Sequence, residues 1–187
     1  MAPRRGGGGM KRPANVVLHG PESTGKSTLG VRLAAHYGTR LVPEYGRLYC
    51  EVRGSETDAD DLVSIMHGHV ALTEAAREQA AERGARLIIS DTDPLMTAAW
   101  AMMGLGQRLP ALDAFTDVGD LYLLMADDIP WVDDGIRLHR TPEARARFMA
   151  LSRAELERRA VPWVLIAGDA EQRFDAAVAA IASAGLA

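Results

Sequence analysis

The feature of this sequence that most constrains its fold is an eight-residue segment between a short apolar run and a helical pattern. Residues 20–27 read Gly-Pro-Glu-Ser-Thr-Gly-Lys-Ser and match G-x-x-x-x-G-K-[ST] at every fixed position. The apolar run 15–18 precedes the segment, and a helical pattern begins at Lys26. A strand, a glycine-rich turn and a helix in this order are the context that a phosphate-binding loop requires. The segment therefore predicts a loop whose backbone N–H groups surround phosphates at a helix N-terminus.

The rest of the chain alternates short apolar runs with longer helical patterns. The runs cover residues 15–18, 40–42, 86–90, 121–125 and 163–167. The helical patterns cover residues 26–37, 59–83, 94–103, 142–159 and 170–184. Each run is continuously apolar rather than alternating, which is typical of strands buried on both faces of a parallel sheet. The alternation predicts an α/β fold of three layers with right-handed crossovers.

Two of the predicted helices begin with a capping signal. Asp93-Pro94 and Thr141-Pro142 each place an N-cap residue before a proline at the first helical position. For Asp93 the capping role explains the residue fully, and a role in the functional site is the alternative.

The amino-acid composition excludes several classes of protein. A chain of 187 residues with 48% hydrophobic residues is an ordinary globular domain rather than a disordered segment. No apolar run approaches the ~18–20 residues of a membrane helix, and the basic start lacks the apolar segment of a secretory signal. The net charge of −4 argues against a dedicated nucleic-acid-binding protein. Cys50 is the single cysteine, which excludes an intrachain disulfide and favours a cytoplasmic location.

The domain organisation is simple. Residues 1–13 are rich in glycine, proline and arginine without periodicity, which predicts a flexible leader. Residues 14–187 are predicted to form one domain, whose oligomeric state the pattern leaves open.

A magnesium ligand is predicted at the end of a second strand. Residues 87–91 read Leu-Ile-Ile-Ser-Asp, an apolar run that ends in a carboxylate. In a phosphate-binding loop, the Lys26 ammonium reaches the β- and γ-phosphates and the Ser27 hydroxyl ligates Mg²⁺. Asp91 is expected to hold the same metal, directly or through water. These residues predict a site for Mg²⁺ and a nucleoside triphosphate, with adenine or guanine left open.

Four motifs together resemble the ribosylnicotinamide kinase domain of NadR-type proteins, within the P-loop NTPase superfamily. They are GPESTGKST (20–28), VPEYGR (42–47), DTDPL (91–95) and WVDDGIR (131–137). The resemblance extends from about residue 14 to residue 180. It implies a fold like that of nucleoside monophosphate kinases, with a five-stranded parallel sheet of order 2-3-1-4-5 and a lid. It also implies transfer of the ATP γ-phosphoryl group to the 5′-hydroxyl of nicotinamide riboside, which yields nicotinamide mononucleotide.

The resemblance also implies roles for individual residues. Catalysis falls to Lys26, Asp91, Arg137 and Glu44. Nucleotide binding falls to Gly20, Glu22, Ser23, Thr24, Gly25, Lys26, Ser27, Thr28, Arg137 and Gly168. The residues implied to contact the acceptor are Glu44, Tyr45, Arg47, Asp93, Trp131 and Asp134. The implied metal ligands are Ser27 and Asp91.

Several of these roles follow from position. Residues 127–140 resemble the lid, in which Arg137 would neutralise charge on the phosphates and Trp131 would cover the pyridine ring. Glu44 or Asp93 would orient the attacking hydroxyl or accept its proton. For Tyr45, packing is the alternative to stacking on the acceptor.

Two further features are predicted to be structural. His69 lies on the apolar stripe of the pattern 59–83, where members of the family often have glutamine, and burial is expected. The charged residues of the pattern 142–159 are expected to form an exposed face. They are Arg145, Arg147, Arg153, Glu155, Glu157, Arg158 and Arg159.

Three functions are compatible with these residues. The first is an Mg-ATP-dependent kinase for nicotinamide riboside. The second is a kinase that catalyses the same phosphoryl transfer but uses another nucleoside or a vitamin-like alcohol as the acceptor. The third is a regulatory ATPase in which hydrolysis only switches the conformation. Glu44 and the lid arginines favour a kinase, because a switch protein needs no acceptor site.

Overall fold

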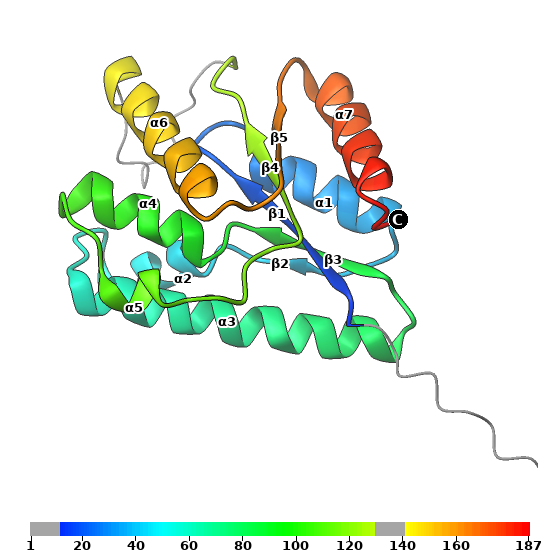
Figure 1. The fold of residues 1–187 in the computed structure, drawn as a ribbon, viewed down its shortest axis with the longest axis horizontal. Coiled ribbons are helices and arrows are strands. Elements are labelled where there is room, and N and C mark those ends of the chain that lie inside the picture. Colours follow the sequence, from blue (N-terminus) through cyan, green and yellow to red (C-terminus); the bar gives the residue numbers. More distant parts are fainter. Residues whose placement is uncertain (1–11, 130–140) are drawn as a thin grey trace, which may run out of the picture.

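The computed structural model describes residues 12–129 and 141–187, and its centre is a single parallel β-sheet (Figure 1). The strands are β1 (Ala14–His19), β2 (Leu41–Val42), β3 (Leu87–Asp91), β4 (Leu121–Met125) and β5 (Trp163–Ile166). Their order in the sheet is β2-β3-β1-β4-β5, and all four neighbouring pairs are parallel. The predicted α/β fold with strand order 2-3-1-4-5 is therefore confirmed.

Helices cover both faces of this sheet (Figure 1). They are α1 (Lys26–His36), α2 (Tyr45–Arg53), α3 (Ala59–Glu82), α4 (Pro94–Gly104), α5 (Pro110–Asp113), α6 (Pro142–Arg158) and α7 (Ala170–Ser183). The five predicted helices are present, and α2 and α5 are additional. No residue of α2 is fully buried, and α5 is a single turn, so neither produces a long apolar period.

The core explains why the predicted strands are continuously apolar. Val16 and Leu18 of β1 pack in one cluster with α1 and α7, whereas Val17 between them packs with α4 and α6. Successive side chains of a strand point to opposite faces, so a sheet covered on both faces must be apolar at every position. Among the described residues, no helix has the length and apolar character needed to cross a membrane.

Both predicted N-caps are confirmed. The Asp93 carboxylate accepts hydrogen bonds from the backbone N–H groups of Leu95 and Met96 at 3.0 and 3.4 Å. The Thr141 hydroxyl oxygen accepts one from the Ala144 N–H at 3.2 Å.

Arg12 contacts the folded domain although the sequence places it in a flexible leader. Its guanidinium donates to both carboxylate oxygens of Asp117 at 2.8 and 2.6 Å and to Glu74 at 2.7 Å. Arg77, which is 4% exposed, pairs with the same two acidic residues. The fold therefore includes Arg12, two residues before β1 begins.

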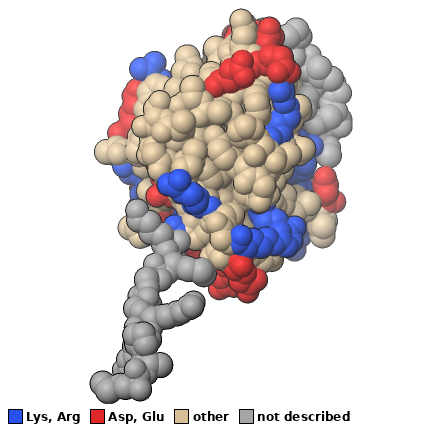
Figure 2. Space-filling view, turned by 90° about the vertical axis from the view of Figure 1, so that its right-hand side faces the viewer, with Lys and Arg blue, Asp and Glu red and all other residues tan. Residues whose placement is uncertain are grey.

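The charged face predicted for α6 is only partly exposed, and in this respect the prediction was wrong. Arg145 is 9% exposed and forms an ion pair with Asp127, while Glu155 is 5% exposed and pairs with Arg108 at 3.3 Å. Charged side chains that pair across elements can be buried, which helical periodicity alone does not show. Figure 2 shows another part of the surface, where basic and acidic side chains lie around a largely uncharged centre.

An aromatic ring packs α2 directly onto a glycine of α3. A Cβ atom added at Gly68 would lie 2.1 Å from a ring carbon of Tyr45. The same ring contacts His69 with its edge, with a centroid separation of 6.3 Å. Gly68 therefore allows α2 to lie close against α3.

We expect Gly68→Ala to lower the free energy of unfolding by about 1–3 kcal/mol, because the new methyl group overlaps the Tyr45 ring. The overlap would outweigh a gain in helix propensity of about 1 kcal/mol. Urea unfolding measures the change. Gly46→Ala is the matched control, because its Cβ would lie at an ordinary 3.6 Å from Ile65. Equal stability of the two variants would contradict the packing argument.

Candidate active site

The loop between β1 and α1 has the backbone of a phosphate-binding turn. Gly20, Ser23 and Gly25 have φ angles of +121°, +60° and +80°. Gly20 also packs closely against β4, since an added Cβ would lie 2.9 Å from the carbonyl oxygen of Met125. Left-handed residues in a short turn let successive backbone N–H groups converge, which is the arrangement that binds anions.

Lys26 lies at the start of α1 and is held by this loop. Its side chain donates hydrogen bonds to the carbonyl oxygens of Gly20 and Pro21 at 2.9 and 2.6 Å. The Thr24 hydroxyl donates to the Pro21 carbonyl oxygen at 2.8 Å. The only lysine in the described residues is thus 9% exposed and fixed at the helix N-terminus, where phosphate groups bind.

Ser27 and Asp91, which are predicted to bind the metal, are in direct contact. The Ser27 hydroxyl donates to Asp91 Oδ2 at 2.5 Å, and Asp91 is 4% exposed. The other carboxylate oxygen, Oδ1, is buried without a hydrogen-bond partner in the described part of the chain. Mg²⁺ binds through one or two carboxylates, a hydroxyl, water and substrate phosphates, so this donor set fits the ion. Within residues 12–129 and 141–187, no group of three or more His, Cys, Asp or Glu side chains could hold a metal by itself.

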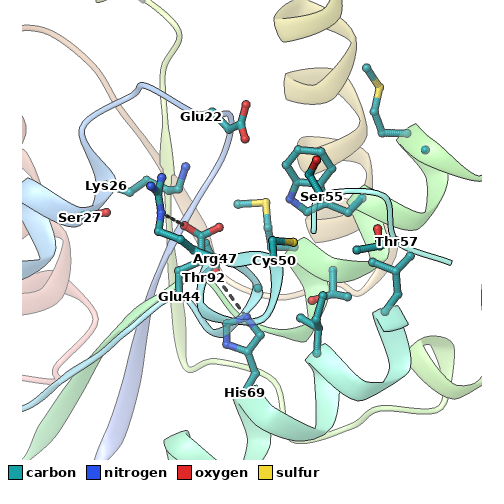
Figure 3. A pocket seen from close by; sticks show the side chains of 18 of the residues that line it. Glu22, Lys26, Ser27, Glu44, Arg47, Cys50, Ser55, Thr57, His69 and Thr92 are labelled. Carbon is teal, nitrogen blue, oxygen red and sulfur yellow. Dashed lines mark hydrogen bonds and ion pairs between the residues drawn. The ribbon is translucent and has the colours of Figure 1, made fainter. Parts of the chain in front are cut away.

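A cavity of about 430 Å³ lies beside these residues (Figure 3). One end is lined by residues 22–28 and Glu44. The other end is formed by α2, the segment between α2 and α3, and α4. Its side chains include Cys50, Ser55, Thr57, Trp100 and Met103. The cavity therefore joins a charged phosphate-binding end to a mostly uncharged far end.

Glu44 is an acidic residue at the phosphate-binding end of the cavity. Burial raises the pKa of Glu44 above its ordinary value of 4.5, and Asp91 and Glu22 raise it further, against the opposing charges of Lys26 and Arg47. Its carboxylate lies 3.8 Å from the guanidinium of Arg47, as Figure 3 shows. A carboxylate with a raised pKa near phosphates is suited to accept a proton.

The structure brings most of the predicted site residues together. Residues 22–28, Glu44 and Arg47 line the cavity, and Asp91 is joined to it through Ser27. Tyr45 packs against Gly68 instead and is not among the lining residues.

Gly168, the predicted nucleotide-binding residue between β5 and α7, also lies outside the cavity lining. Its N–H donates to the Asp128 carboxylate at 2.7 Å. Trp131, Asp134 and Arg137 lie outside the described residues.

Asp93, which was predicted to contact the acceptor, is turned away from the cavity. It is 3% exposed, and its Oδ2 accepts a hydrogen bond from the Tyr122 hydroxyl at 2.5 Å while Oδ1 caps α4. Both oxygens are thus engaged by the protein. The member of the DTD motif that lines the cavity is Thr92.

Sequence reasoning missed the residues of α3 and α4 that line the cavity. Leu62, Ile65 and His69 of α3, and Met96 and Trp100 of α4, line it. Their helical spacing predicts burial, and it carries no signal that separates a cavity wall from the core.

Arg173 of α7 was missed as well, although it holds the phosphate-binding loop. It is 4% exposed and donates to the carbonyl oxygens of Thr24 and Gly168 at 3.1 and 2.6 Å. It also pairs with Asp128, whose other oxygen binds the Gly168 N–H. The arginine therefore ties the loop to the segment that joins β5 and α7.

The fold and the site define a P-loop protein of the nucleoside-monophosphate-kinase-like class. The chain belongs to the family described as AAA domain, whose profile matches residues 15–173. Its relatives include the protein named "Trifunctional NAD biosynthesis/regulator protein NadR" of Escherichia coli strain K12, which is 31% identical over 166 residues. The protein of the same name from Salmonella typhimurium is 33% identical over 128 residues. The resemblance seen in the sequence motifs is thus confirmed.

This chain corresponds to part of those relatives. The matches cover 85% of this chain and 40% of the Escherichia coli protein, and 65% and 30% for the Salmonella protein.

Solved structures confirm the fold. A NadR protein in complex with NR has a TM-score of 0.74 at 22% identity, covering 92% of this chain and 51% of that chain. A NadR protein in complex with NAD and AMP-PNP has a TM-score of 0.71 at 22% identity, covering 94% and 51%. Thymidylate kinase from Ehrlichia chaffeensis has a TM-score of 0.66 at 13% identity, covering 92% and 100%.

The burial of Asp93 predicts a stability that depends on pH. Burial raises the pKa of Asp93 from 3.8 to about 6, against its hydrogen bonds from Tyr122 and the α4 N-terminus. Between these values the unfolded chain has ionised Asp93 while the folded chain keeps the proton, so ionisation opposes folding. Stability from this group is therefore fully present below about pH 4 and declines as the pH rises to about 6.

We expect wild type to lose about 2 kcal/mol relative to Asp93→Asn between pH 4 and pH 6. Urea unfolding of both proteins across this range measures the difference. A difference that stays constant with pH would show that Asp93 does not titrate in this environment.

Proposed function

We propose that this protein is an Mg-ATP-dependent kinase that phosphorylates the 5′-hydroxyl of nicotinamide riboside to give nicotinamide mononucleotide. The observation that carries the proposal is one cavity with two kinds of group at its charged end. Lys26 and Ser27 can bind phosphates and metal there, and Glu44 can accept a proton. The NadR relatives, named for NAD biosynthesis, and the NadR structure in complex with NR support this choice of acceptor.

The site residues divide the reaction among them. Lys26 and the loop N–H groups bind the ATP phosphates, and Ser27 and Asp91 hold Mg²⁺. The bound ion neutralises charge on the phosphate oxygens. Glu44 accepts the proton of the acceptor hydroxyl as its oxygen forms a bond to the γ-phosphorus. The bond from the γ-phosphorus to the bridging oxygen breaks, and ADP leaves with that electron pair. Catalysis rests on positioning these groups and on electrostatic stabilisation.

Residues outside the described ranges complete the proposal. Arg137 neutralises charge on the transferring group, and Trp131 and Asp134 contact the acceptor. A cytoplasmic location is also proposed, supported by the unpaired Cys50.

The cavity favours a kinase over a regulatory ATPase. Its volume of about 430 Å³ falls within the range of roughly 300–1,000 Å³ of small-molecule sites. It extends from the phosphate-binding loop along α2 and α4. A switch protein would need no such space beyond the nucleotide.

The direct test is acceptor-dependent ADP formation. The protein is incubated with Mg-ATP and a panel of nucleosides, and ADP and phosphorylated products are measured. We expect ADP with nicotinamide riboside and none with Lys26→Ala, which lacks the phosphate-binding ammonium. Activity with a different acceptor would support the mechanism and show that the proposed substrate is wrong. Slow hydrolysis that is independent of any acceptor would overturn the kinase proposal.

Glu44→Gln should separate turnover from ATP binding. We expect kcat to fall by about 10²- to 10⁴-fold, because the general base is lost, with little change in ATP affinity. In wild type, kcat/KM should rise with pH through the pKa of Glu44, which lies above its ordinary value of 4.5. This acidic limb should be absent from the variant. Loss of ATP affinity along with turnover would place Glu44 in the nucleotide site instead.

A further inference from the structure

Thr92 has an unusual backbone at a critical position. It directly follows Asp91 and has a φ angle of +69°, in the left-handed region. A β-branched residue is strained there, at about 1–3 kcal/mol, and such strain is typical of functional sites. The Thr92 N–H donates to the Leu18 carbonyl oxygen at 3.1 Å, which anchors the turn to β1.

His69 of α3 contacts the side chain of this strained residue. Its Nε2 lies 3.4 Å from the Thr92 hydroxyl oxygen, the contact drawn as a dashed line in Figure 3. Both residues are 2% exposed, and both line the cavity. The edge of the Tyr45 ring packs against the imidazole. Burial lowers the pKa of His69 to about 4, so the ring is neutral near pH 7.

A histidine in this position can set the direction of the threonine hydroxyl. A hydroxyl has one donor and two acceptor sites, and a neutral imidazole nitrogen occupies one of these. The rest are left for a ligand. Because Thr92 is adjacent to Asp91 in the chain, a ligand hydroxyl bound there would lie beside the metal-binding and phosphate-binding groups. Asp93 cannot offer the same contact, since protein groups engage both of its oxygens.

We propose that the Thr92 hydroxyl binds a sugar hydroxyl of the acceptor, and that His69 is a positioning residue that orients it. This inference rests on the kinase function proposed above. It assigns the recognition of the acceptor sugar to the middle residue of the DTD motif.

The test compares variants that differ in the hydroxyl alone. Thr92→Val keeps the shape and branching of the side chain, and Thr92→Ser keeps the hydroxyl. Thr73→Val is the matched control, because Thr73 is a buried threonine of α3 outside the cavity lining. With nicotinamide riboside and Mg-ATP, we expect Thr92→Val to lower kcat/KM for the acceptor by about 10- to 100-fold, with an unchanged KM for ATP. The kcat/KM of Thr92→Ser should stay within about threefold of the wild-type value, and that of Thr73→Val should equal the wild-type value.

A double-mutant cycle tests the role of His69. If His69 acts through the Thr92 hydroxyl, His69→Phe, which keeps an aromatic ring and lacks the ring nitrogens, should lower kcat/KM for the acceptor in wild type and have little further effect in Thr92→Val. Additive effects would overturn the positioning role. Should Thr92→Val fail to fold, Thr92→Gly replaces it, since glycine lacks the hydroxyl and adopts this φ angle without strain.

The experiments distinguish failure of the kinase function from failure of the role proposed for Thr92. If wild type forms no ADP with any acceptor, the kinase function fails and this inference fails with it. If wild type is active and Thr92→Val has the same kinetics, the inference alone is overturned. If Thr92→Val lowers kcat/KM as expected, deoxy analogues of nicotinamide riboside identify the partner hydroxyl. Removing this hydroxyl should lower the kcat/KM of wild type by the same factor as Thr92→Val does, and should leave the kcat/KM of Thr92→Val unchanged. An equal loss in both proteins would contradict the contact.

Discussion

The hydrogen bond from Ser27 to Asp91 is the interaction on which the rest of the site depends. It joins the first turn of α1 to the end of β3 at 2.5 Å. The parallel register of β1 and β3 makes it possible, because Leu18 pairs with Asp91 two residues before the phosphate-binding loop begins. Since parallel strands end at the same edge of the sheet, the loop and the carboxylate meet there.

Charge is distributed around this bond by elements far apart in the chain. Arg173 reaches back from α7 to the carbonyl oxygen of Thr24, which couples the last helix to the phosphate-binding loop. On the other side, α2 brings Arg47 near Glu44, within the electrostatic influence of Lys26. Desolvation of the Glu44 carboxyl group raises its pKa, and these two positive charges oppose the shift.

Sequence patterns predicted the elements with a strong local signal. The four longer strands each contain a run of at least three consecutive apolar residues and lie within one residue of their predicted bounds. Asp93 and Thr141 were recognised as N-caps because a cap and the following proline are adjacent in the sequence. The helix α2 was missed because it buries no residue fully. Arg145 was predicted to be exposed because its partner Asp127 lies in another element.

By itself the sequence determined the phosphate-binding loop and the carboxylate of Asp91 that contacts it. Their chemistry resides in eight contiguous residues and in a carboxylate at the end of an apolar strand, so no distant contact is needed to recognise them. Only the tertiary structure decided which residues line the cavity beside the loop. Within the DTD motif, the left-handed turn at Thr92 directs Asp91 to Ser27 and Asp93 to Tyr122. The physical reason is that helical and strand periodicity encode burial, whereas a cavity wall depends on where separate elements pack against one another.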